Sequence, residues 1–365
     1  MSTTLYDRIY AVNAVAPVAN AMGDHTELLT WREAEEQYGF LQELLPQKIE
    51  GWSRKVDWGR DFVYHSMDRP AGQTEDGQER HRLMCEAIIR KGGRINAWDL
   101  GRTWLDLIKP ENFGKLLGPQ DQVIYWSLYA GVPATEVGKY ATFPGMHGTS
   151  KMIQPIGLVN ACNPRQAALD AHDVGRMKDV TGFTRNYALE VAAALAAACA
   201  HALTSNATVG SVIDTALAQL SSAPRAEVEQ GLAWAKQHKD WKVLREVYQE
   251  HYNGKLMSDA VENLSSSLAV FYLCDGDAHQ GMLWAVNMAR DADDRAYDVA
   301  CLSAALNGLG TFPREWIDTV DNQLLTDDVT VSNRSLKDTA DGLYQATLNT
   351  YEANRAVQSE IEKLL

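Results

Sequence analysis

Three carboxylates, Asp291, Asp293 and Asp294, fall within four consecutive positions directly ahead of a run of small apolar residues, 299–305. Like charges at this spacing repel one another, and burying an unpaired carboxylate costs more than packing returns. This run predicts a tightly packed core helix that ends at Gly308. We therefore interpret the acidic group as a helix start that holds a divalent cation in a cleft. The stretch alone leaves one alternative open, an acidic first turn stabilised by the helix dipole.

A second acidic group, Thr74, Glu75 and Asp76, follows the turn signal at residues 69–72 and directly precedes another helix. Its oxygen atoms are hard ligands that suit Mg²⁺, Ca²⁺ or Mn²⁺. By itself this group could equally be a helix N-cap with acidic residues in the first turn. Two such groups at loop-to-helix junctions are more informative, because two-metal sites in helical proteins are assembled from carboxylates on separate elements.

Helical spacing of apolar residues dominates the rest of the chain. Residues 6–22 predict a buried helix that kinks or restarts at Pro17. Segment 40–70 predicts loop and short helix, and convincing alternating strands are scarce. With no linker and no repeat, the sequence predicts an all-α, compact multi-helix single domain over residues 1–365. Further helices are predicted at 31–38, 79–90, 96–108, 153–159, 167–177, 187–203, 209–220, 226–236, 264–273 and 281–289.

Composition excludes several classes of protein. The net charge of −14, without clustered Lys and Arg, disfavours nucleic acid as a partner. Residues 1–8 lack the order of a signal peptide, and the apolar run 188–203 is interrupted by Glu190 and His201, so we expect a buried helix, no membrane partner and a cytoplasmic location. The five cysteines form no Cys-x-x-Cys pair and predict reduced, buried thiols.

Two loops carry further candidates. Thr26 and Glu27 follow the first buried helix, where a lone Glu is usually only solvent-exposed. His147 lies between Gly145 and Gly148 and could contact a substrate, although a loop His is more often incidental. No Gly-Lys-Ser or Gly-Lys-Thr follows this loop, so it does not match the phosphate-binding pattern.

The order of these motifs resembles the ADP-ribosylglycohydrolase family, which includes the dinitrogen-reductase-activating glycohydrolases, over about residues 8–316. The family's opening, Gly-Asp-Ala-Leu-Gly-x-Pro-x-Glu, aligns without a gap with residues 19–27 and places Glu27 on its acid/base glutamate. Its Thr-Asp-Asp motif corresponds to Thr74-Glu75-Asp76, and its Asp-x-Asp-Thr motif to Asp291-Ala292-Asp293-Asp294. Its Gly-Asn-Gly loop corresponds to Met146-His147-Gly148, followed by Pro155-Ile156-Gly157.

The resemblance implies an all-α hydrolase of a glycosidic bond, N-linked or O-linked. Two Mg²⁺ ions, or Mn²⁺, would grip the cis hydroxyls of a ribose-like sugar, and Glu27, on a mobile loop, would transfer the proton. The implied metal ligands are Thr74, Glu75, Asp76, Asp291, Asp293 and Asp294, and the implied substrate-binding residues are Asn20, Met146, His147 and Gly148.

Several motif positions depart from the family pattern. Asn20 and Glu75 replace Asp, His147 replaces Asn, Met146 replaces Gly and Asp294 replaces Thr. Because these changes alter substrate-facing motifs, and no basic cluster is evident for a pyrophosphate, we favour a small nucleoside-like or sugar conjugate as substrate. The alternative is a catalytically silent family member that acts as a binding or structural protein.

Overall fold

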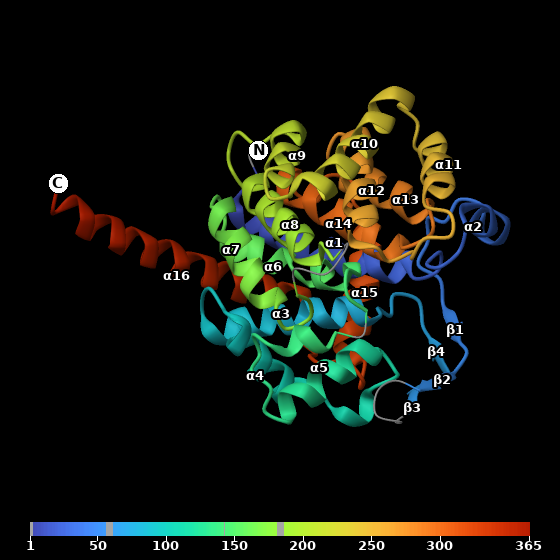
Figure 1. Ribbon diagram of the computed structural model, residues 1–365, viewed down its shortest axis with the longest axis horizontal. Coiled ribbons are helices and arrows are strands. Elements are labelled where there is room, and N and C mark those ends of the chain that lie inside the picture. Colours follow the sequence, from blue (N-terminus) through green and yellow to red (C-terminus); the bar gives the residue numbers. More distant parts are fainter. Residues whose placement is uncertain (1–2, 56–60, 142, 181–185) are drawn as a thin grey trace.

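The computed structural model describes residues 3–55, 61–141, 143–180 and 186–365. Two helices, α1 (Leu5–Gly23) and α14 (Ala292–Asn307), pack along each other in the middle of the molecule (Figure 1). Nearly all residues of α14, and those of α1 from Ile9 onward except Tyr10, are buried, and small or apolar residues make up most of them. A helix of that kind is stable only when it is surrounded by protein. The Ala-rich α8 (Ala188–Ala202) is also mostly buried and packs against α14.

Other helices enclose this centre. Figure 1 shows α16 running out of the bundle, and its residues 351–365 are exposed. In chain order the enclosing helices are α2 (Trp31–Tyr38), α3 (Asp76–Lys91), α4 (Ala97–Leu107), η2 (Pro110–Asn112), α5 (Pro119–Tyr129), η3 (Val137–Tyr140), η4 (His147–Met152), α6 (Gln154–Val159), α7 (Pro164–Gly175), α9 (Val209–Leu217), α10 (Ser222–His238), α11 (Trp241–His251), α12 (Ala260–Leu273), α13 (Ala278–Val286), α15 (Arg314–Thr326) and α16 (Leu336–Glu362).

The all-α prediction is confirmed, and each predicted helix is present with ends shifted by a few residues. The predicted restart of the helix at Pro17 is wrong, because α1 is a single helix from Leu5 to Gly23. A proline removes one intrahelical hydrogen bond. Packing of α1 against α14 along its length holds the helix together despite that loss.

The segment before α3 contains short strands, so the prediction of loop and short helix for 40–70 is wrong. Strands β1 (Gln47–Ile49) and β4 (Met67–Arg69) pair antiparallel, as do β2 (Trp52–Lys55) and β3 (Asp61–Tyr64). Strands of three or four residues are too short to produce a recognisable alternation. Figure 1 shows these two small sheets at the edge of the helical body.

Two smaller predictions can be compared with the structure. Among the described residues, no helix combines the length and the apolar character needed to cross a bilayer. All five cysteines are free, and Cys85, Cys199, Cys274 and Cys301 are buried as predicted. Cys162 is exposed, which corrects the prediction of buried thiols, because it lies in a tight turn after α6 with φ +63°.

Gly157 allows α6 to approach α8 closely. A Cβ at this position would lie 2.7 Å from Cys199 Cβ and 2.8 Å from the Ala196 carbonyl oxygen. We expect Gly157→Ala to lower the free energy of unfolding by about 1–3 kcal/mol, because overpacking a core forces its neighbours apart. Gly210→Ala is the control: it is an exposed helical glycine whose Cβ would meet nothing nearer than Thr208 Oγ1 at 3.8 Å. Urea unfolding that gives both variants the same midpoint would contradict this packing.

Candidate functional site

The two acidic groups that the sequence singles out lie in the wall of one cavity. Its volume is about 520 Å³, and its lining includes Glu75 and Asp76 from one group and Asp291 and Asp294 from the other. Glu27 also lines it. Helices α3 and α14 therefore begin at the same place, although their first residues are more than two hundred positions apart in the sequence.

The first group is held at the start of α3 by α1. Glu75 is the N-cap residue of α3 and its carboxylate accepts a hydrogen bond from the Gly77 backbone at 2.9 Å, so the capping alternative describes this residue correctly. The buried Asn20 of α1 accepts from the Glu75 backbone N–H at 2.9 Å and donates to the Glu75 carboxylate. Asn20 thus orients Glu75 rather than lining the cavity.

The second group follows a strained turn. Ala289 and Arg290 have φ values of +58° and +60°, a left-handed conformation that costs non-glycine residues about 1–3 kcal/mol. The buried Arg290 forms a two-pronged ion pair with Glu262, with Nη2 donating to Oε2 at 2.9 Å. Arg295 donates to the Ala289 carbonyl at 2.7 Å. These contacts hold the backbone so that α14 starts with Asp291 at the cavity.

Glu27 is fixed beside that turn. The Leu28 N–H donates to the Arg290 carbonyl at 2.7 Å, and the Arg290 N–H donates to the Leu29 carbonyl at 2.9 Å. The Thr26 hydroxyl also donates to the Val286 carbonyl at 2.7 Å. The loop that carries Glu27 was expected to be mobile. These hydrogen bonds instead fix it to residues 286 and 290 on both sides of Glu27.

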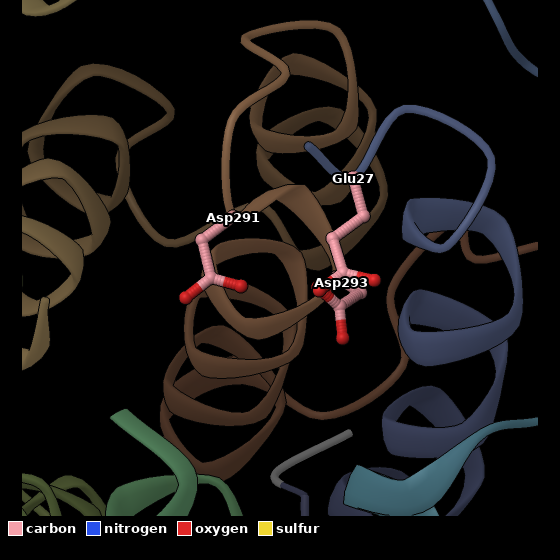
Figure 2. A group of neighbouring side chains, drawn as sticks. All are labelled: Glu27, Asp291 and Asp293. Carbon is pink, nitrogen blue, oxygen red and sulfur yellow. The ribbon is translucent and has the colours of Figure 1, made fainter. Parts of the chain in front are cut away.

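Three carboxylates gather at this junction (Figure 2). One oxygen from each of Glu27, Asp291 and Asp293 lies within 4.8 Å of the others. The close approach depends on Gly23 at the end of α1, where a Cβ would come within 2.3 Å of Asp293 Cα. Asp293 is fully buried, and within the described part of the chain its Oδ1 has no hydrogen-bond partner.

A lysine lies among the carboxylates. Lys151 Nζ is 2.8 Å from Glu75 Oε1 and 2.6 Å from Asp294 Oδ1, it also contacts Asp293 Oδ2, and it lies 3.8 Å from Asp76 Oδ1. Its side chain is 4% exposed. Burial opposes its charged form, but Asp293, Asp294 and Glu75 raise the pKa of Lys151 well above its usual value. A permanent positive charge therefore joins the two acidic groups.

One ammonium does not neutralise the whole cluster. Burial alone would raise the pKa values of Glu75 and Asp294, yet the Lys151 charge lowers both. Desolvation raises the pKa values of Glu27 and Asp291 well above their usual range, and neighbouring carboxylates add to the effect. Burial and repulsion therefore favour the protonated form on the Glu27 and Asp291 side of the cluster, which Lys151 compensates less.

Lys151 decides how a metal would fit. A divalent ion that bridged Glu75 to Asp293 and Asp294 would need the volume that Lys151 Nζ fills. The residues as placed therefore do not fit the expected pair of ions. Glu27, Asp291 and Asp293 do fit one ion, since they offer hard oxygen ligands at suitable spacing.

The other predicted residues occupy different places. Of the described residues, the cavity lining includes Met146 and Gly148 but not Thr74, Asn20 or His147. Thr74 is buried just before α3. His147 is completely buried, with Nε2 2.8 Å from Asp298 Oδ2, and this contact raises its pKa against the effect of burial. It supports the chain beneath the cavity. Substrate contact stays a prediction for Met146 and Gly148.

Sequence reasoning missed two basic residues of the site. Arg80, on α3, donates to Asp76 Oδ2 at 2.6 Å and pairs with the buried Asp121 at 2.8 Å. Lys151 is the only Lys, Arg, Asp or Glu between residues 140 and 164. That isolation, together with an excess of predicted buried carboxylates, was the signal that could have identified it.

Comparisons with known proteins agree with this fold. The family model described as ADP-ribosylglycohydrolase matches residues 1–353. A solved structure of an ADP-ribosylglycohydrolase-related protein complex is similar, with a TM-score of 0.63 and 19% identity, covering 95% of this chain and 100% of that one. The search of curated proteins gives no match. Because the family model spans nearly the whole sequence, the chain belongs to the ADP-ribosylglycohydrolase family, a family of glycosidic-bond hydrolases.

Proposed function

We propose that this protein hydrolyses the glycosidic bond of a small ribose-like conjugate, with Glu27 as the acid and base. The observation that carries the proposal is the position of Glu27 in the wall of the cavity, beside Asp291 and Asp293. A family of glycosidic-bond hydrolases supplies the reaction class. The residues around Glu27 supply the reasons to assign the proton transfer to it.

The surroundings of Glu27 favour proton transfer. Desolvation and the Asp293 charge raise its pKa well above that of a free glutamate. A carboxyl group with a raised pKa can hold a proton near neutral pH, donate it to the leaving atom of the glycosidic bond, and then take one from water. The other carboxylates stay in place to accept hydrogen bonds from the sugar hydroxyls.

One divalent cation fits this proposal. Asp291 and Asp293 would hold it, with Mg²⁺ or Mn²⁺ as the natural choice for oxygen ligands, and Glu27 would contact it only in its ionised form, because a carboxyl group that carries a proton is a poor ligand. Such an ion would supply Lewis acidity at the site. The fixed backbone around Glu27 and Asp291 keeps these carboxylates in position without reorganisation, which favours the transition state.

Aromatic rings at the rim favour a nucleoside-like conjugate. Trp52 and Tyr64, from β2 and β3, line the cavity and stack with ring centroids 5.4 Å apart and an interplanar angle of 1°. Trp52 is 44% exposed, so a planar group in the cavity could contact its indole. A flat aglycone on this platform would place the attached sugar toward the carboxylates.

We expect Glu27→Gln to lower kcat for hydrolysis by about 10²-fold or more, because Gln keeps the shape of the side chain but cannot carry the proton. Sugar release from a panel of N-ribosides, O-linked ADP-ribose and simple glycosides, with Mg²⁺ or Mn²⁺, is the measurement. Glu36→Gln is the matched control, since Glu36 is exposed on α2 and should leave the rate unchanged. Wild-type turnover by Glu27→Gln would show that another group transfers the proton.

For Trp52→Ala, we expect KM for a substrate with an aromatic aglycone to rise about tenfold, with kcat little changed, because base stacking is worth about 1–3 kcal/mol. The control is Trp98→Ala, which removes an exposed indole from α4 outside the cavity lining. An unchanged KM on steady-state kinetics would remove the aromatic platform from the substrate site.

A second candidate function, ligand binding without hydrolysis, is favoured by Lys151. Its ammonium fills the place between the two acidic groups where the family resemblance implies a metal ion. This is expected of a family member that keeps the cavity but has lost the reaction. Calorimetric titration with the same panel distinguishes the two functions. The binding function would be established by a ligand that binds the wild-type protein and is recovered intact after prolonged incubation with Mg²⁺ and Mn²⁺.

A further inference from the structure

The point where the two acidic groups meet is filled by a side chain of the protein itself. Lys151 Nζ has Glu75 Oε1 at 2.8 Å on one side, and Asp294 Oδ1 at 2.6 Å and Asp293 on the other. The contacts with Glu75 and Asp293 are charge-assisted hydrogen bonds, and the contact with Asp294 is an ion pair. The ammonium thus joins the start of α3 to the start of α14, the connection that a bridging metal ion would otherwise make.

The local backbone is shaped for this lysine. A Cβ on Gly77, in the first turn of α3, would lie 1.9 Å from Lys151 Cδ and 2.2 Å from Cε. The stem of the lysine therefore lies in space that exists because residue 77 has no side chain. Lys151 itself lies on η4, directly after the glycine-bearing loop, and is buried together with its neighbours Ser150 and Met152. Because the stem is enclosed, the ammonium has few other positions that it could occupy.

We propose that Lys151 is a built-in cation that replaces one divalent ion, so that the protein binds at most one such ion, at Glu27, Asp291 and Asp293. This inference goes beyond the proposed hydrolysis and holds whether or not the chain is an enzyme. It concerns only which positive charges occupy the cluster.

Position, rather than the sum of charges, carries this inference. The five carboxyl groups of Glu27, Glu75, Asp291, Asp293 and Asp294 outnumber the one ammonium of Lys151, so a count of ionisable groups alone would admit further cations. The place between the acidic groups is taken, however, and a second cation there would meet the ammonium at contact distance. The buried Asp293 Oδ1 has no hydrogen-bond partner among the residues that the structure describes, and Asp293 belongs to the carboxylate trio with Glu27 and Asp291. An open ligand atom therefore remains for one ion.

The test counts bound Mn²⁺ on the full-length protein by equilibrium dialysis and elemental analysis. We expect wild type to bind no more than one Mn²⁺ per chain. Lys151→Met keeps the length of the stem and removes the charge, so it should bind one Mn²⁺ more than wild type. In EDTA the variant should lose about 5 °C or more of Tm, because the carboxylates are left unpaired. Added Mn²⁺ should restore that loss.

Two controls isolate the effect of charge at this position. Lys151→Arg keeps a positive charge and should bind no additional Mn²⁺. Lys178→Met removes another buried lysine, which within the described residues has no hydrogen-bond partner at Nζ and forms no ion pair with Glu75, Asp293 or Asp294, and it should also bind no additional Mn²⁺. Wild type that binds two Mn²⁺ per chain overturns the proposal even if Lys151→Met does not fold. A folded Lys151→Met with the wild-type count overturns it as well.

Discussion

The contact between the Lys151 ammonium and the carboxylates of Glu75, Asp293 and Asp294 is the constraint on which the candidate site depends. Helices α3 and α14 both begin with acidic residues at one cavity. Without Lys151, the fold would bury these carboxylates beside one another with nothing to offset their repulsion. Lys151 supplies one compensating charge permanently, at the cost of desolvating it. The compensation is uneven: the carboxyl groups of Glu75 and Asp294 have lowered pKa values, whereas those of Glu27 and Asp291 have raised ones. That asymmetry separates a structural half of the cluster from a half that can carry protons or bind an ion.

The helical body makes this arrangement rigid through close approaches. Gly23 lets the end of α1 touch the start of α14, and Gly77 leaves room for the stem of Lys151. The strained residues Ala289 and Arg290 are held by the buried ion pair to Glu262. Strain of this kind persists only where the surroundings over-determine the backbone. The backbone hydrogen bonds between residues 28–29 and Arg290 also fix Glu27, so Glu27, Asp291 and Asp293 form one unit.

Much of this could be predicted from the sequence because the signals are local. Helical periodicity and capping residues identified the helices, and the motif order placed Glu27, Glu75 and Asp291 on the same family pattern. The short strands before α3 were missed because three or four residues cannot display an alternation. Lys151 was missed for a different reason. Nothing near it in the sequence is charged, and its partners come from α3 and α14, so only the tertiary structure shows that it enters the acidic cluster. Asn20 and His147 were expected to face a substrate, yet their contacts are to Glu75 and Asp298, which no local pattern reveals.

If Lys151 replaces one divalent ion, this side chain and a single ion share a cluster that the family resemblance would give to two ions. The most direct measurement is anomalous scattering at the manganese edge from crystals of the wild-type protein grown with saturating Mn²⁺. We expect no more than one anomalous peak, placed among Glu27, Asp291 and Asp293, with the Lys151 ammonium still against Glu75 and Asp294. Two peaks a few ångströms apart, with the Lys151 side chain displaced from the cluster, would contradict it.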